Sequence, residues 1–325
     1  MKTVLSSVMS LVALLAAVFV TPASAATCES LARVALKSAT IDRAEAVAPG
    51  KFVSPDGGRR GRGDSSPYAD LPAFCRVAAT LTPSRDSDIK IEVWLPAPAQ
   101  GVGGQASGWN GKFQAVGNGG WAGAISYAAM ADALRAGYAT ASTDTGHVGG
   151  RGTFALDHPE KLIDFSWRSE HEMTVHAKAL IQEFYGRAPT LSYWNGCSTG
   201  GRQGLKEAQM FPSDYDGIIA GAPANRTAIS LWIAHAVLKD PASYIPPDKY
   251  AVIHQAALAA CDAGDGVKDG LIDNPAACHF DPAVLRCSGA DAPSCLTDAQ
   301  VAAAKKIYSP AINPRTGAEL FASNT

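Results

Sequence analysis

The sequence predicts an α/β protein in which helices cover both faces of a mostly parallel sheet. Two observations indicate this class. Between about residues 88 and 223, short apolar segments alternate with segments of helical spacing, a pattern that favours a parallel sheet with a helix layer on each face. A glycine-flanked serine lies where one of these strands meets a helix. Sheets of this kind place their functional sites at the carboxyl ends of strands.

The first predicted elements follow from local spacing and turn residues. Residues 50–67 are rich in glycine, proline and charge, as in an exposed loop, and we interpret their Arg62-Gly63-Asp64 tripeptide as a chance match rather than an integrin-binding motif. Apolar residues alternate along 88–97, which predicts a half-buried strand. Next come a short strand that runs into a glycine turn at 112–120, a helix at 130–137 and a strand with a turn at 138–146.

The later elements are predicted in the same way. Apolar residues recur at helical spacing from about residue 169 to 184, and a strand at 190–196, a helix at 200–211 and a strand at 216–223 follow. After about residue 225 the chain becomes rich in alanine, proline, aspartate and closely spaced cysteines. We therefore expect one domain at 26–224 and a second at 225–325.

Residues 1–25 predict a signal peptide. Lys2 precedes an apolar run at 8–20, and the small residues Ala23-Ser24-Ala25 follow as a cleavage site. A membrane anchor is the weaker interpretation, because the run is shorter than the about 18–20 apolar residues that span a bilayer. We therefore expect a secreted protein, periplasmic or extracellular, that has no membrane contact after cleavage.

The composition indicates a globular enzyme. Of the 325 residues, 47% are hydrophobic and 18% charged, and the formal net charge is −2. A chain without a basic excess gives no support for binding nucleic acid or an anionic membrane. The length after cleavage suffices for one large domain or two small ones. The sequence specifies no oligomeric state.

The segment Gly196-Cys197-Ser198-Thr199-Gly200 matches the G-x-S-x-G pattern of a serine nucleophile. Small residues on both sides of the serine permit a sharp strand-to-helix turn that exposes its hydroxyl group. The helix that follows directs main-chain amides toward a developing oxyanion. A turn with a purely structural role is the alternative, but the predicted strand, turn and helix are those that a nucleophile requires.

A second amide donor for the oxyanion is expected from the glycine turn GNGGWAG at 117–123. In this architecture the donor follows an earlier strand. Gly119 or Gly120 would supply one N–H group and Thr199 the other. The alternative is a plain tight turn. Dinucleotide binding is not expected, because no G-x-G-x-x-G segment precedes a helix here.

The chain resembles the tannase and feruloyl esterase family. The resemblance is strongest in residues 194–224, WNGCSTGGRQGLKEAQMFPSDYDGIIAGAPA, and runs from about Cys28 to the end of the chain. Further matching segments are GNGGWAG at 117–123, ASTDTGH at 141–147, HPEKLIDFSWRSEHEMT at 158–174 and CDAGDGVKDGLIDNPAAC at 261–278. Relatives in this family include bacterial hydrolases of aromatic monoesters such as mono(hydroxyethyl) terephthalate.

The resemblance implies an α/β-hydrolase core interrupted by a large lid domain. Residues 26–224 would form the N-terminal part of the catalytic domain and residues 225–325 part of the lid. The implied activity is that of a secreted serine hydrolase, of feruloyl esterase or tannase type, which cleaves carboxylic esters of phenolic or aromatic acids. A small aromatic ester would acylate Ser198, and water would then release the acid.

Seven cysteines follow the predicted cleavage site. Export makes disulfides the expected state, and an odd number leaves one cysteine without a partner. Zinc binding by cysteines is not expected, because the chain has no C-x-x-C pair. The resemblance implies three disulfides, Cys28–Cys75, Cys261–Cys278 and Cys287–Cys295. It also implies that Cys197 pairs with a cysteine next to the catalytic histidine, outside this chain.

The resemblance places the catalytic acid and histidine after the lid. The sequence ends at Thr325 within the expected lid, and it contains no His-Cys dipeptide. We therefore expect a C-terminally incomplete enzyme that is nearly inactive alone. In the alternative, one of the histidines present acts as the base. His147, just past a predicted strand, is the best such candidate, although a buttressing role for it is preferred.

Residues 262–273, DAGDGVKDGLID, predict a calcium loop. Four aspartates separated by glycines offer carboxylate oxygens, and calcium prefers oxygen ligands. The loop departs from an EF-hand because no glutamate closes it. An ordinary turn rich in aspartate and glycine is the alternative, but the family carries calcium at matching positions. The expected ligands are the carboxylates of Asp262, Asp265 and Asp269 and the main-chain oxygens of Val267 and Leu271.

A non-catalytic function is the rival hypothesis. A secreted protein stabilised by calcium could bind a partner or a plant phenolic without hydrolysing it. An extended coding region with a His-Cys pair would favour the enzyme, whereas a stable folded product that ends at Thr325 would favour the binding protein.

Overall fold

The structure, a computed structural model, describes residues 26–55, 67–97, 108–225, 234–235, 237 and 240–321. The chain divides into two compact units, Met1–Ala224 and Asn225–Thr325. The predicted signal peptide and the Arg62-Gly63-Asp64 tripeptide lie outside the described residues. Within the described part of the chain, no helix has the length and apolar character needed to cross a membrane.

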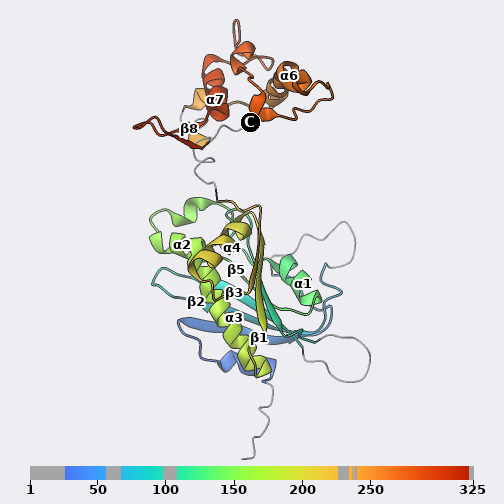
Figure 1. Cartoon of the computed structure of the whole chain (residues 1–325). Coiled ribbons are helices and arrows are strands. Elements are labelled where there is room, and N and C mark those ends of the chain that lie inside the picture. The colour runs from blue at the N-terminus through green and yellow to red at the C-terminus, as the bar shows by residue number, and fades with distance from the viewer. Residues whose placement is uncertain are drawn as a thin grey trace, which may run out of the picture. The chain divides into compact units, whose positions relative to one another are not determined.

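A seven-stranded mixed sheet forms the centre of the first unit, with the order β1-β2-β3-β5-β4-β6-β7 (Figure 1). The strands β5, β4, β6 and β7 pair in parallel, and β1, β2, β3 and β5 pair antiparallel. The bounds are β1 (Ala39–Val47), β2 (Phe74–Leu81), β3 (Ile89–Pro96), β4 (Lys112–Val116), β5 (Ala139–Thr143), β6 (Leu191–Cys197) and β7 (Gly217–Gly221). The predicted α/β class is confirmed, and its parallel half carries the Ser198 motif.

Helices cover both faces of this sheet. The helix α1 (Tyr127–Arg135) lies on one face, and α2 (Pro159–Ile163), α3 (Ser169–Tyr185) and α4 (Thr199–Met210) lie on the other (Figure 1). A π-helical turn, Asp164–Arg168, joins α2 to α3 without a break. The helix predicted at 130–137 corresponds to α1, which begins three residues earlier than expected.

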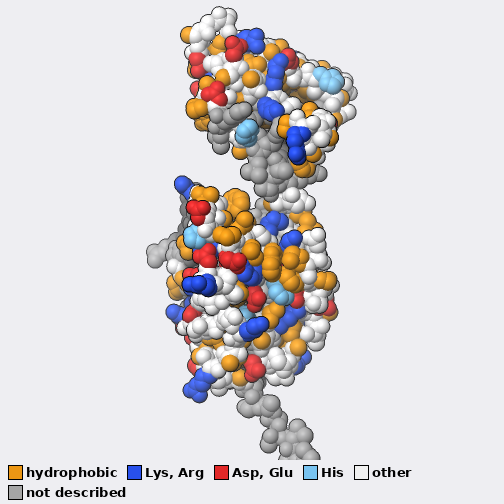
Figure 2. Space-filling view, turned by 90° about the vertical axis from the view of Figure 1, so that its left-hand side faces the viewer, with side chains coloured by type: hydrophobic (Ala, Val, Ile, Leu, Met, Phe, Trp, Pro, Cys, Tyr) orange, Lys and Arg blue, Asp and Glu red, His pale blue; other side chains and the backbone are white. Residues whose placement is uncertain are grey.

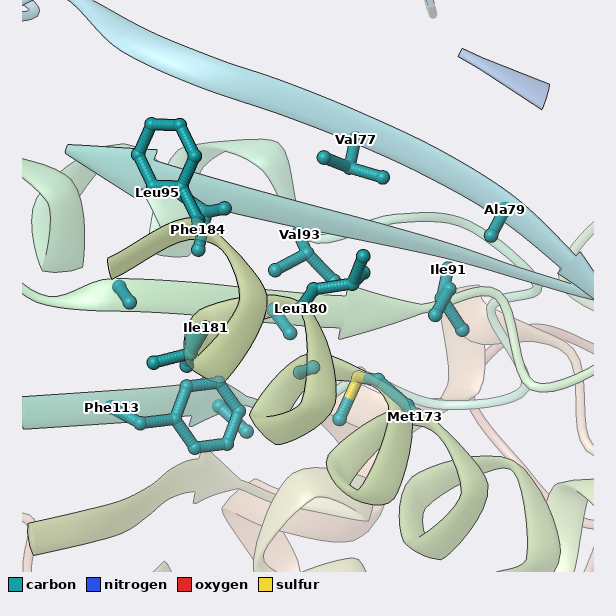
Figure 3. Close-up of a cluster of buried hydrophobic side chains, with 14 of the residues drawn as sticks. Val77, Ala79, Ile91, Val93, Leu95, Phe113, Met173, Leu180, Ile181 and Phe184 are labelled. Carbon is teal, nitrogen blue, oxygen red and sulfur yellow. The ribbon is translucent and has the colours of Figure 1, made fainter. Parts of the chain in front are cut away.

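One hydrophobic core lies between α3 and the sheet. Its members on α3 recur at helical spacing, so they share one face of the helix. They point toward aliphatic residues of β2 and β3 and toward the phenyl ring of Phe113 in β4 (Figure 3). The labelled members are Val77, Ala79, Ile91, Val93, Leu95, Phe113, Met173, Leu180, Ile181 and Phe184. Full burial of each large side chain stabilises the fold by about 1.5–3 kcal/mol.

The opposite face of the sheet has an aromatic core with a charged pair inside it. Trp94 packs against Phe74, with ring centroids 4.7 Å apart. Arg76 and Glu92 form a buried ion pair beside these rings. Glu92 also accepts hydrogen bonds from Trp94 Nε1 at 3.0 Å and from Tyr127 Oη at 3.1 Å. The desolvation cost of the buried carboxylate is thus offset by several donors.

Helices and short strands form the second unit. They are α6 (Tyr250–Cys261), α7 (Asp298–Tyr308), β8 (Ala311–Ile312) and β9 (Glu319–Phe321). A capping box starts α7, in which Thr297 and Gln300 bond to each other's main-chain amides. The buried cluster beneath these helices is small and includes Ile245, Ile253 and Leu296. A core of this size benefits from covalent links.

Three disulfides form, and they are the expected pairs Cys28–Cys75, Cys261–Cys278 and Cys287–Cys295. The first links the N-terminal 3₁₀ helix, Cys28–Arg33, to β2, and the other two lie in the second unit. Within the described part of the chain, Cys197 is free and exposed.

Candidate active site

Ser198 sits on a strained turn between β6 and α4. Its φ and ψ angles are 59° and −116°, in a region that residues with a side chain rarely adopt. The turn is held from β7, because the amide of Ser198 donates to the main-chain oxygen of Gly221 at 3.0 Å. The side chain is exposed. This is the geometry that a G-x-S-x-G motif gives to a nucleophile.

Two close backbone crossings explain the glycines around this turn. A Cβ atom on Gly196 would lie 2.5 Å from the main-chain oxygen of Gly200. A Cβ atom on Gly117, at the end of β4, would lie 2.5 Å from the Cα atom of Gly200. Neither position has room for a methyl group, so the serine turn and the glycine turn pack directly against each other.

Hydrogen bonds join the glycine turn to the start of α4. The amide of Gly200 donates to the main-chain oxygen of Asn118 at 2.8 Å. The hydroxyl of Thr199 donates to the main-chain oxygen of Gly120 at 2.8 Å. Gly119 and Gly120 are exposed, and Thr199 provides one of the first amides of α4, which have no partner within the helix. The structure thus brings the expected oxyanion donors to the same edge of the sheet as Ser198.

A buried network of polar side chains holds the glycine turn against α4. The side chain of Gln203 accepts a hydrogen bond from the amide of Asn118 at 3.0 Å and donates one to Asn118 Oδ1 at 2.9 Å. Gln203 Nε2 also donates to the carboxyl group of Glu170. Burial raises the pKa of Glu170 to about 7. Sequence reasoning missed this network, because its members lie on three separate segments.

Aromatic side chains flank the glycine turn. The indole of Trp121 stacks on Phe165, with ring centroids 4.9 Å apart. Phe165 belongs to the π-helical turn and lies under the guanidinium of Arg202, 5.0 Å from its ring centroid. Arg202 also donates to the main-chain oxygen of Phe165 at 3.0 Å. Trp121 is 42% exposed, so part of this aromatic group remains available to a ligand.

His147 lies near the glycine turn, and both of its ring nitrogens have hydrogen-bond partners. Its Nε2 atom is 2.8 Å from the main-chain oxygen of Trp121, and its Nδ1 atom is 3.1 Å from the hydroxyl of Thr145. The ring stacks on Phe154, with centroids 3.7 Å apart. These contacts are those of a residue that supports the turn. His147 also lines a cavity of about 430 Å³ together with Asp144, whose pKa burial raises to about 7.

The other histidines of the first unit also contact groups other than Ser198. His158 Nδ1 lies 2.9 Å from Asp86, and His171 Nδ1 lies 2.7 Å from Asp214. His176 faces Glu172 on its own helix. Within the described part of this unit, no hydrogen bond between a histidine and Ser198 is present.

His171, Glu207 and Asp214 could together hold a metal ion. One ligand atom from each lies within 4.8 Å of the others. Burial, together with the nearby carboxyl groups of Glu170 and Asp214, raises the pKa of Glu207 to about 9. Sequence reasoning missed this group as well, because the residues follow no ligand spacing.

The predicted calcium loop turns as its glycines suggest. Gly266 and Gly270 have φ angles of 93° and 85°. Asp262 Oδ1 accepts hydrogen bonds from the amides of Asp269 at 3.2 Å and Gly270 at 3.1 Å. The three predicted carboxylates are not among the described groups whose ligand atoms lie within 4.8 Å of one another.

The two residues predicted to bind calcium through main-chain oxygens are exposed. Val267 and Leu271 are 56% and 62% exposed. These two residues therefore contribute little to the core. An oxygen-only set of carboxylates and main-chain oxygens is compatible with calcium.

The face that carries α2, α3 and α4 exposes hydrophobic side chains among charged ones (Figure 2). The exposed large hydrophobic residues of these helices are Leu162, Val175, Leu205 and Met210.

Comparison with known proteins relates these features to a family. The family model described as tannase and feruloyl esterase matches residues 75–324. An uncharacterized esterase of Xanthomonas campestris pv. campestris is 40% identical over 315 residues, which are 95% of this chain and 52% of that protein. A probable feruloyl esterase B of Emericella nidulans is 41% identical over 246 residues, which are 74% of this chain and 45% of that protein.

A solved structure extends the comparison to the fold. The crystal structure of feruloyl esterase B from Aspergillus oryzae superposes with a TM-score of 0.72 and 32% sequence identity. The match covers 91% of this chain and 58% of that one. The chain thus spans about half the length of the curated relatives that it matches.

Proposed function

Because the chain belongs to the tannase and feruloyl esterase family, we propose that it carries the nucleophile and oxyanion-binding elements of a serine carboxylic-ester hydrolase. The observation that carries this proposal is the backbone of Ser198, held at a φ of 59° between β6 and α4. A strained serine turn of this kind, packed against a glycine turn, is suited to acyl transfer.

In the proposed reaction, Ser198 Oγ attacks the carbonyl carbon of an ester while a histidine takes its proton. The amides of Thr199 and of Gly119 or Gly120 donate to the resulting oxyanion. When the tetrahedral intermediate collapses, the alcohol leaves with the proton from the histidine, and an acyl group remains on Ser198. Water activated by the same histidine then attacks the acyl-enzyme and releases the acid.

We propose that the histidine and the acid of the triad lie in the part of family-length proteins that this chain does not span. Two observations support this. The four histidines of the first unit contact other groups. Cys197, next to the nucleophile, is free among the described residues. A cysteine beside the proposed histidine would pair with Cys197 and hold the base close to Ser198. The 325-residue chain alone is then nearly inactive.

The proposed substrates are esters of phenolic or aromatic acids. Two relatives carry the name feruloyl esterase B. In this chain the aromatic group of Trp121, Phe154 and Phe165 lies beside the glycine turn, where it can contact a planar acyl group. Offset-stacked or edge-to-face pairs of aromatic rings contribute about 0.5–1.5 kcal/mol beyond the area that they bury, which favours an aromatic acyl group here.

We also propose that residues 262–271 bind calcium through Asp262, Asp265, Asp269 and the main-chain oxygens of Val267 and Leu271. The positive φ angles of Gly266 and Gly270, which turn the chain on either side of Val267 and Asp269, support this assignment. Secretion into an oxidising compartment is proposed as well, because three disulfides form in a chain that begins with a predicted signal peptide.

The test compares methyl ferulate with an aliphatic methyl ester as substrates of the polypeptide encoded by the complete reading frame. We expect faster turnover of the ferulate, and we expect Ser198→Ala to abolish turnover of both. Binding of ferulate without any turnover would contradict the proposal and would favour a non-catalytic binding protein. The 325-residue chain, assayed in parallel, should show little activity.

A further inference from the structure

A cluster of three side chains away from Ser198 has the composition of a metal site. His171 lies in the first turn of α3, Glu207 in the last turn of α4, and Asp214 in the loop between α4 and β7. One ring nitrogen and two carboxylate oxygens, one atom from each residue, lie within 4.8 Å of one another. The helices α3 and α4 are neighbours on the same face of the sheet (Figure 1).

Glu207 is the member whose surroundings favour a bound cation. The residue is 1% exposed. No donor group of the described residues bonds to either oxygen of its carboxyl group, and its polar neighbour is the carboxyl group of Asp214, with which it can share a proton. A buried ionised carboxylate without a partner is strongly destabilising, so such groups are neutralised by a proton, a cationic side chain or a metal ion.

Among the described residues, no neighbouring cationic side chain donates a hydrogen bond to this carboxylate. The ammonium group of Lys178 donates to the main-chain oxygen of Asp214 rather than to a carboxylate. Arg202 directs its guanidinium to main-chain oxygens of the π-helical turn. Glu170 contributes a further buried carboxyl group near Glu207. Among the described residues, Glu207 and Glu170 therefore have no direct cationic partner, whereas Asp214 pairs with His171.

The other two members are oriented and accessible. His171 Nδ1 lies 2.7 Å from Asp214 Oδ2, and the imidazole stacks on Phe211 with centroids 3.7 Å apart. The side chains of His171 and Asp214 are 26% and 12% exposed. Two of the three members are thus partly exposed to solvent, whereas Glu207 is buried.

We propose that His171, Glu207 and Asp214 bind one divalent transition-metal ion, with zinc as the best fit, and that this ion ties α3 to α4. Zinc binds both imidazole nitrogen and carboxylate oxygen, whereas calcium takes oxygen ligands only. Ligands at about 2.1 Å from a tetrahedral zinc ion lie about 3.4 Å apart, so small side-chain rotations would close the site around the ion. Water would complete the coordination.

Zinc titration after chelation tests the proposal. All variants carry Cys197→Ser, because an exposed thiol is itself a zinc ligand. We expect one zinc ion to bind the folded chain by calorimetry and to raise the melting temperature by several degrees, with calcium unable to replace it at this site. The variant Glu207→Gln keeps the side-chain volume and should weaken zinc binding by about 100-fold.

Two matched variants locate the effect. Glu172→Gln removes a carboxylate from α3 that faces His176 instead of the cluster, and it should bind zinc as the parent does. Asp265→Asn alters the proposed calcium loop and should likewise leave zinc binding unchanged. These results do not depend on esterase activity, so the metal site and the proposed function can fail separately.

A shared proton between Glu207 and Asp214 is the competing arrangement, and it would overturn the proposal. In that case Glu207→Gln would leave zinc affinity unchanged. X-ray absorption of the zinc-loaded parent chain provides a test that needs no Glu207 variant. We expect scattering from one imidazole and from oxygen ligands. Sulfur scattering, or several imidazoles, would place the zinc elsewhere and contradict the assignment.

Discussion

The amide of Gly200 donates a 2.8 Å hydrogen bond to the main-chain oxygen of Asn118, and this bond couples the serine turn to the glycine turn. The two turns belong to different strands, β6 and β4, which pair in parallel. Their carboxyl ends therefore meet at one edge of the sheet. The position of the proposed oxyanion donors relative to Ser198 depends on contacts of this kind.

The network behind the glycine turn should be needed for catalysis more than for binding. Replacing Gln203 with alanine removes the acceptor of the Asn118 amide and one of the donors to the carboxyl group of Glu170. Loss of one oxyanion donor costs about 10²–10³ in kcat, so a displaced donor should lower kcat by about 10- to 100-fold with little change in KM. Steady-state kinetics on methyl ferulate, with the polypeptide encoded by the complete reading frame, would measure kcat and KM of the variant.

The control for this variant is Gln209→Ala, which removes the same side chain from an exposed position of the same helix. It should leave both kinetic constants unchanged. A Gln203→Ala enzyme with normal kcat would show that the network does not position the donors.

The close backbone crossing at Gly196 should make this position intolerant of any side chain. An added methyl group would lie 2.5 Å from the main-chain oxygen of Gly200. Gly196→Ala should therefore lower the free energy of unfolding by about 1–3 kcal/mol or prevent folding. Gly150→Ala is the matched control, since a methyl group there meets no atom within 4 Å. Equal unfolding midpoints in urea for the two variants would contradict the close approach of Gly196 to the main chain of Gly200.

Asp144 should make the fold less stable as the pH rises. Burial raises its pKa from the ordinary value of 3.8 to about 7, although its carboxylate accepts hydrogen bonds from the amides of Lys90 and Gly146. Between about pH 4 and pH 7 the unfolded chain loses a proton that the folded chain retains. The contribution of Asp144 to stability is therefore largest below about pH 4 and declines up to about pH 7.

The variant Asp144→Asn cannot titrate and isolates this effect. As the pH rises from about 4 to about 7, the free energy of unfolding of this variant should increase relative to that of the parent. Urea unfolding of both proteins at the two ends of this range would measure the shift. An unchanged difference between them would mean that Asp144 ionises in the folded chain as it does in water.

Removal of calcium should destabilise the second unit. The carboxylates of Asp262, Asp265 and Asp269 repel one another when no cation lies between them. Chelation with EGTA should therefore lower the melting temperature by several degrees, and Asp265→Asn should reproduce most of the loss. Asp248→Asn, an exposed aspartate of the same unit, is the control and should still respond to EGTA. Identical melting with and without EGTA would contradict a calcium site.

The part of the site that is continuous in sequence could be predicted from sequence. Strand, tight turn and helix around Ser198 are encoded within about 20 residues, so local spacing and small residues were sufficient. The predicted glycine turn could be added because its architecture requires a second amide donor after an earlier strand. The three disulfides were expected only through the family resemblance.

Other features depend on contacts between distant segments. The strands β1 and β2 were missed, since their alternation is weak and several of their residues are alanine. Asn118, Glu170 and Gln203 meet only after the sheet and two helices have assembled. The same holds for the cluster around Glu207. No spacing rule links such residues, and only the three-dimensional arrangement identifies them.

The most direct test of the central claim is the location of a covalent adduct on the polypeptide encoded by the complete reading frame. After reaction with an organophosphate ester, peptide mass spectrometry should find one phosphorylated residue, Ser198. The Ser198→Ala variant should remain unmodified. A stoichiometric adduct on any other residue, or an active enzyme that lacks Ser198, would contradict the assignment of this residue as the nucleophile.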